Sequence, residues 1–172
     1  MQQVKLTLSH LLQAAALLVL VACTQTVGHF TPVAATNPEN TVLYVYRPAA
    51  SAPGLMKPLK FDYPDVLIDG KSIGVLKYNE YIVTELSPGA HTITITGLTT
   101  ASSGWAERDI ERVIPASQGG QVFMKVQVEY DTENMTLDQL SAKYLIHLLP
   151  VDGEDAKYEI RNTSPASPRV PG

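Results

Sequence analysis

The chain has 172 residues, with 13 Lys and Arg against 17 Asp and Glu and a formal net charge of −4 at pH 7. This length predicts one domain with tails. The charges are spread along the chain, and no run of Lys or Arg occurs that would neutralise phosphates, which argues against nucleic acid as a partner. The single cysteine excludes an internal disulfide.

The N-terminus has the layout of a secretory signal peptide. Lys5 supplies the positive flank, and an apolar stretch follows from Leu11 to Ala22. Ser9 and His10 precede this stretch and Gln13 interrupts it. The stretch is also too short for a transmembrane helix of about 20 apolar residues. We therefore predict that residues 1–22 are a signal peptide.

The cysteine stands where the apolar stretch ends. Leu20-Val21-Ala22-Cys23 resembles the lipobox of bacterial lipoproteins, which has an aliphatic residue, a tolerant position, a small residue and an obligatory cysteine. The resemblance implies cleavage before Cys23, a thioether-linked diacylglycerol and an N-acyl chain on that residue, and no further cofactor. Acyl chains at about 0.8 kcal/mol per buried CH₂ make such attachment to a bilayer effectively permanent. The alternative is an ordinary buried cysteine in an apolar helix.

The residue after the cysteine bears on location. In such lipoproteins an aspartate there commonly signals retention in the inner membrane, whereas this chain has Thr24. The resemblance therefore favours the cell envelope, at the outer membrane, with the domain facing the periplasm.

Both flanks of the central region have the composition of loose chain. Residues 23–40 are rich in Thr, Pro, Ala and Asn without a sustained period, which predicts a disordered tether with a root-mean-square reach of roughly 23 Å. Residues 163–172 contain several prolines and are predicted to be a flexible tail.

Residues 41–162 mostly follow the period of two that marks β-strands. Thr41–Arg47 is β-branched and aromatic on both faces, which predicts a central, buried strand. Turn residues punctuate the region at Asp69-Gly70, at Ser87-Pro88-Gly89 and at Gln118-Gly119-Gly120. We predict a mainly β domain, an antiparallel β-sandwich of about seven or eight strands with a short C-terminal helix.

The last part of this region is less clear. Residues 136–149 fit either a helix or a buried strand, and we favour a helical turn over Leu137–Ser141 followed by a strand. Further on, Asp152 is placed to cap a short helix that has Glu154 and Asp155 in its first turn and ends at Arg161 and Asn162.

One block carries a family resemblance: PDVLIDGKSIGVLKYNEYIVTELSPGAHTITITG, residues 64–97, preceded by YVYRP. It resembles the bacterial lipoprotein domain of unknown function 2846, and it is similar to sandwich modules of the PEGA type. The resemblance implies a β-sandwich fold and a lipid anchor but no reaction and no catalytic site. The segment 98–108 departs from the family pattern.

The sequence supplies little that suggests catalysis. His91 follows a turn, where bonding to turn carbonyls is the simpler expectation, and His147 stands in an apolar stretch typical of a core or edge histidine. No paired cysteines or His-X-X-X-His spacing supports a metal site, and no nucleophile elbow or P-loop occurs. We predict a protein that is not an enzyme.

Binding is the stronger expectation. Trp105, the only tryptophan, lies in a Gly- and Ser-rich loop near Arg108, and an exposed aromatic there would suit a partner surface. The alternative is that Trp105 folds back over the edge of the sandwich. We predict a lipid-anchored envelope lipoprotein whose sandwich is a non-enzymatic binding or adaptor module for another envelope protein, through an exposed strand edge. The alternative is binding of a carbohydrate such as peptidoglycan or surface polysaccharide.

Overall fold

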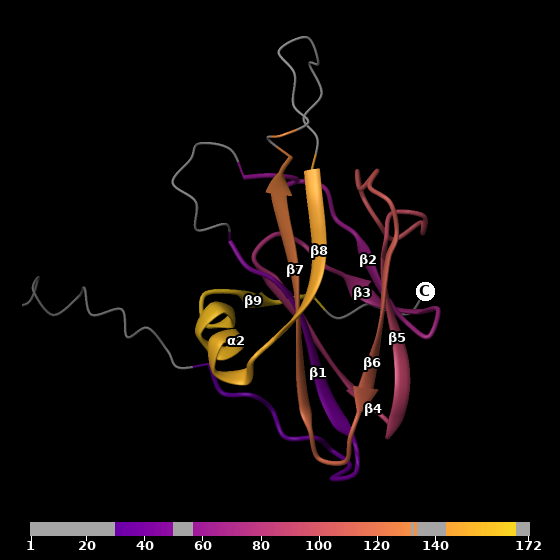
Figure 1. Ribbon diagram of the computed structural model, residues 1–172, viewed down its shortest axis with the longest axis vertical. Coiled ribbons are helices and arrows are strands. Elements are labelled where there is room, and N and C mark those ends of the chain that lie inside the picture. Colours follow the sequence, from indigo (N-terminus) through magenta and orange to yellow (C-terminus); the bar gives the residue numbers. More distant parts are fainter. Residues whose placement is uncertain (1–29, 50–56, 132, 134–143, 168–172) are drawn as a thin grey trace, which may run out of the picture.

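The computed structural model describes residues 30–49, 57–131, 133 and 144–167. Two β-sheets pack face to face (Figure 1). One has five strands in the order β8-β7-β1-β4-β9 and the other has four in the order β3-β2-β5-β6. The elements are β1 (Thr41–Arg47), β2 (Asp65–Ile68), β3 (Lys71–Val75), β4 (Glu80–Leu86), β5 (Gly89–Thr96), β6 (Ile110–Ala116), β7 (Gln121–Tyr130), β8 (Tyr144–Val151), α2 (Gly153–Ile160) and β9 (Ser164–Pro165). The predicted mainly β sandwich with a short C-terminal helix is confirmed.

The main core lies between the two sheets. Alternate residues of β1, β2, β5 and β7 point inward and are almost completely buried, among them Leu43, Val66, Ile95 and Met124. Period-two alternation produces this layer because successive side chains of a strand point to opposite faces of its sheet.

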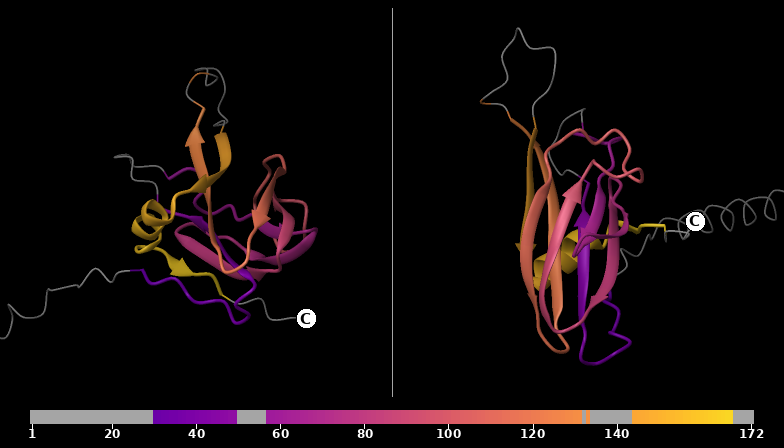
Figure 2. Two further views of the ribbon diagram at one scale, coloured as in Figure 1. Left: turned by 60° about the horizontal axis from the view of Figure 1, so that its bottom comes forward. Right: turned by 90° about the vertical axis from the view of Figure 1, so that its right-hand side faces the viewer.

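A second, smaller core covers the outer face of the five-stranded sheet. The remaining side chains of β1, including Tyr44 and Tyr46, pack there against Phe123 and against Ala156 and Ile160 of α2. All seven residues of β1 are therefore buried. This confirms the prediction of a central strand that is buried on both faces, and Figure 2 shows α2 against that sheet.

The strand directions differ from the prediction in two places. β1 pairs with β7 and β4 pairs with β9 in parallel, while the other pairs of strands are antiparallel. The chain crosses from β6 in one sheet to β7 in the other through Ser117–Gly120, and the main-chain N–H of Val42 donates to Gly120. Because this crossing delivers β7 to the end of the sheet where β1 begins, the two strands run the same way. The sandwich is mixed, not purely antiparallel.

The predicted turns occur where the sequence places them. Asp69 and Gly70 join β2 to β3 with φ values of 50° and 77°, which suits the left-handed conformations of a tight hairpin. Ser87 and Pro88 join β4 to β5, and residues 117–120 form the turn before β7.

Parts of the predicted tether and tail pack against the domain. Residues 30–40 run along the domain, and Phe30 packs edge-on against Tyr44 and Tyr81. Glu85 accepts hydrogen bonds from the main-chain N–H of Thr36 and the side chain of Asn40. At the other end, Ser164–Pro165 forms β9 beside β4. Local composition missed these contacts because the groups that hold the two segments lie on other strands, Tyr44 on β1 and Glu85 on β4.

The C-terminal helix is confirmed as predicted. The carboxylate of Asp152 accepts the main-chain N–H of Glu154 at 2.9 Å, and Arg161 is the C-terminal cap. The strand predicted for the latter half of residues 136–149 is β8, which begins at Tyr144. The helical turn predicted over Leu137–Ser141 lies outside the described residues.

Candidate functional site

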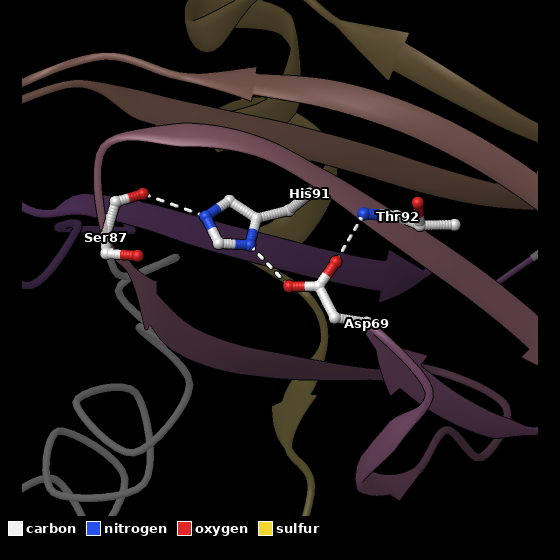
Figure 3. Close-up of polar contacts among 4 residues, drawn as sticks. All are labelled: Asp69, Ser87, His91 and Thr92. Carbon is white, nitrogen blue, oxygen red and sulfur yellow. Dashed lines mark hydrogen bonds and ion pairs between the residues drawn. The ribbon is translucent and has the colours of Figure 1, made fainter.

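His91 connects two turns of the sandwich (Figure 3). Its Nδ1 lies 2.7 Å from Oδ2 of Asp69, in the turn between β2 and β3, and its Nε2 lies 2.8 Å from the main-chain oxygen of Ser87, before β5. The other oxygen of Asp69 accepts the main-chain N–H of Thr92 at 2.8 Å. The expectation that His91 bonds a turn carbonyl is confirmed.

The electrostatics favour the charged forms of this pair. The hydrogen bond to Asp69, followed by that to Ser87, raises the pKa of His91. The hydrogen bond from Thr92, followed by that from His91, lowers the pKa of Asp69. Since both ring nitrogens face acceptors, an imidazolium that donates from both satisfies the site best. The Ser87 contact uses the carbonyl and not the hydroxyl, so these residues do not form the nucleophile–base pair of a serine hydrolase.

Arg47 is a charged residue that is buried. It ends β1 and is 2% exposed. Its guanidinium donates to the main-chain oxygens of Asp62 at 2.9 Å and Pro58 at 3.1 Å, and it also reaches that of Leu59 at 2.5 Å. Burial lowers the pKa of Arg47 to about 10, so the group is still protonated at pH 7. Arg47 therefore holds the segment 57–63 against the end of the sandwich.

Trp105 belongs to the same buried cluster, which corrects the idea of an exposed tryptophan. It is 5% exposed, and its ring centroid lies 5.5 Å from Cζ of Arg47. Its indole Nε1 is buried without a hydrogen-bond partner. The alternative, that the ring folds back onto the sandwich, is the one observed. Arg108 is exposed, so the two residues do not form a shared surface patch.

The loop that carries Trp105 approaches the end of β5 very closely. A Cβ atom added at Gly97 would lie 1.9 Å from the main-chain oxygen of Trp105. Only glycine fits at this point without a shift of backbone. No feature of the sequence identified the close approach at Gly97. For Arg47 there was a signal, because it is the one charged residue of a strand predicted to be buried, and a buried guanidinium needs hydrogen-bond acceptors.

A groove of about 350 Å³ lies beside α2 on the outer face of the five-stranded sheet. Polar side chains line it, including Lys125, Gln127, Asp155 and Glu159, and Tyr158 stands at its side with 64% of its surface exposed. Glu159 accepts hydrogen bonds from the Tyr46 hydroxyl at 2.8 Å and from Nζ of Lys125 at 2.7 Å. This groove combines fixed polar groups with an exposed aromatic ring, over which the guanidinium of Arg161 lies with its Cζ 3.6 Å from the ring centroid.

The other predicted site residues are separate from these clusters. His147 is exposed on β8, an edge strand. Cys23 lies outside the described residues. Among the residues that the structure describes, no three or more His, Cys, Asp or Glu side chains are placed to hold a metal ion. Within the same ranges no helix has the length and apolar character needed to cross a bilayer.

Comparison of the chain with family models, with curated proteins and with solved structures finds no match. The resemblance to the domain of unknown function 2846 therefore stays a prediction from the quoted motifs.

Proposed function

We propose that this protein is a lipid-anchored lipoprotein of the bacterial envelope, and that its sandwich is a non-enzymatic binding or adaptor module facing the periplasm. The observation that carries the proposal is Leu20-Val21-Ala22-Cys23 at the end of a signal-like apolar stretch. Thr24 in place of an aspartate supports the outer membrane as the location.

The contacts of Phe30 add a geometric consequence to this proposal. Phe30 already packs on the sandwich, through Tyr44 and Tyr81. Seven residue steps separate it from Cys23, and a chain of that length spans at most about 25 Å. An acyl chain on Cys23 would thus hold the sandwich close to the bilayer surface, and the partner must be reached from there.

The test is the intact mass of the protein extracted from membranes of a bacterial host. We expect a chain that begins at Cys23 and carries acyl groups, and we expect a Cys23→Ser variant to lack them. Thr26→Ser, three residues further on, is the matched control and should be processed normally. An unmodified chain that retains residues 1–22 would contradict the anchor and the location together, and would leave the sandwich fold unaffected.

The carbohydrate alternative is favoured by a different observation, the groove beside α2. Tyr158 is 64% exposed next to Lys125 and Gln127 although the guanidinium of Arg161 lies over its ring. Stacking of an aromatic ring with adjacent polar groups is a recurrent way to hold a sugar. Tyr158→Ala should reduce co-sedimentation with isolated peptidoglycan by tenfold or more. Phe61→Ala, which removes another exposed ring (72% exposed) away from the groove, should not. Equal binding by wild type and both variants would remove this site from consideration.

A further inference from the structure

The sandwich has four sheet edges, and one of them lacks the usual protection. Edge strands normally avoid pairing with other chains by being short or by carrying charges, proline or bulges. β9 has two residues, β3 begins with Lys71 and carries a bulge at Ile73, and β6 contains Glu111, Arg112 and Pro115. By contrast β8 is eight residues long, YLIHLLPV, and contains no Asp, Glu, Lys or Arg. Only Pro150, near its end, interrupts it.

The exposed part of β8 belongs to a ribbon that extends beyond the rest of its sheet. β7 pairs with β1 only as far as Lys125, whereas its pairing with β8 continues to Tyr130 and Tyr144. Figures 1 and 2 show this end of β7 and β8 projecting past the other strands. A two-stranded ribbon is only marginally stable without a third strand or a packing partner.

We infer that β8 pairs antiparallel with β8 of a second copy of this chain. The two five-stranded sheets would then join into one continuous sheet around a two-fold axis. Among the residues that the structure describes, β8 pairs with β7 alone, and β6, although it lies close to β8 across the sandwich, does not pair with it. Because β8 contains no Asp, Glu, Lys or Arg, self-pairing brings none of these charged side chains together.

The sequence of β8 selects the register. Residues that face each other across an antiparallel pair lie on the same face of the sheet. Because Leu145, His147 and Leu149 share the outer face, an outer residue must face an outer residue of the second copy. With the axis at His147, Leu145 faces Leu149 and Ile146 faces Leu148, so that aliphatic side chains meet on both sides. This register also leaves Pro150 at the end of the ladder, where its missing N–H costs least.

The occupant is a second copy because the strand is nearly symmetric about His147, reading Leu-Ile-His-Leu-Leu. An isologous two-fold contact requires this self-complementarity, whereas pairing with another protein does not. The inference goes beyond the proposed envelope role and does not depend on the lipid, so loss of the anchor would leave it intact.

Disulfide trapping tests the register in the full-length protein. All variants carry Cys23→Ser, so that the introduced thiol is the only one. In the proposed register the two 147 positions lie with Cα atoms about 4.5–5.5 Å apart, within the range that a disulfide spans. Mild oxidation of purified His147→Cys should therefore give a covalent dimer on a non-reducing gel, at least ten times faster than the controls.

Two controls separate this register from chance collision. Leu145→Cys is on the same strand and face, but in the dimer its two copies lie four residues out of step, about 13 Å apart. Val113→Cys is 65% exposed on β6, the edge strand of the other sheet. Neither should form dimers alone, whereas Leu145→Cys mixed with Leu149→Cys should.

The inference is overturned if His147→Cys stays monomeric, or if Val113→Cys forms dimers as fast. A second measurement covers a variant that fails to fold. Light scattering of the parent protein should show a dimer at micromolar concentration, and a monomer at all concentrations would overturn the inference equally. A Leu145→Lys variant, which places a charge on this edge, should be monomeric by the same light-scattering measurement.

Discussion

Arg47 ends β1 as a guanidinium that donates to carbonyls 11 to 15 residues further along the chain. A buried charge is costly unless its hydrogen bonds are satisfied. Here main-chain oxygens of residues 58–62 satisfy it, and the rings of Tyr78 and Trp105 lie 5.8 Å and 5.5 Å away. One side chain thus organises the loops at one end of the sandwich.

Replacing Arg47 by methionine tests this role. Arg47→Met keeps an unbranched side chain but removes the guanidinium. The main-chain oxygens of Asp62 and Pro58 then lose this donor, while that of Leu59 keeps only the main-chain N–H of Asp62 at 3.3 Å. Each buried acceptor left unpaired costs about 1–3 kcal/mol. We expect the free energy of unfolding in urea to fall by at least about 2 kcal/mol, and proteolysis to begin within residues 57–63. Arg112→Met, at an exposed arginine of β6, should change stability by less than about 0.5 kcal/mol. Equal effects of both variants would contradict the assignment.

His91 makes a prediction about pH. The raised pKa of His91 contributes stability that is complete below its unfolded-state value of 6.5 and is lost as pH rises through the raised value. The lowered pKa of Asp69 contributes stability that is complete above 3.8 and is lost as pH falls through the lowered value. Both contributions are therefore complete between pH 3.8 and 6.5.

The measurement is urea unfolding followed by the fluorescence of Trp105 from pH 4 to 8. The stability difference between wild type and His91→Gln should be greatest near pH 5 and should shrink above pH 7. Asp69→Asn, which keeps a residue that tolerates positive φ, should lose the same pH dependence, and the double variant should lose no more. A difference that is constant with pH would show that the contact between His91 and Asp69 does not contribute.

At the scale of elements, the segment 30–40 is the clearest departure from local expectation. Its composition is that of a tether, yet Phe30 packs on two tyrosines, and the main-chain N–H of Val33 donates to the Tyr44 hydroxyl at 2.7 Å. The segment covers part of the outer face of β1 together with α2.

Phe30→Ala should release this segment. Because Phe30 is only half-buried, we expect a loss of about 1–2 kcal/mol, less than the 3–5 kcal/mol of a fully buried phenylalanine. Amide exchange at Val33 should accelerate at the same time. Val33→Ala, which truncates a side chain that is 53% exposed, is the matched control and should have little effect. If amide exchange at Val33 is unchanged in Phe30→Ala, Phe30 does not hold this segment on the sandwich.

At the scale of the whole molecule, the five-stranded sheet has a buried apolar cluster on each of its two faces. The inner face of each sheet contributes to the main core, and α2 with the segment 30–40 closes the outer face of the five-stranded sheet. This arrangement leaves Phe30, the first residue that the structure describes, on the outer face of the five-stranded sheet, and it leaves β8 at the edge of the same sheet.

The sequence alone determined the features that depend on near neighbours. The period of two, the hairpin at Asp69-Gly70 and the cap at Asp152 are local properties, since each needs contacts only within a few residues. The central position of β1 also followed, because residues 42–46 are apolar or aromatic on both faces of the strand.

The tertiary structure alone decided the rest. Four features join separate segments of the chain: the parallel pairing of β1 with β7, the burial of Trp105, the packing of Phe30 and the contacts of Arg47. Arg47 also binds the loop that follows its own strand. Local composition is the same whether such a residue is covered or exposed. Its burial depends on which distant segment lies over it, and that is fixed only when the sheets pack.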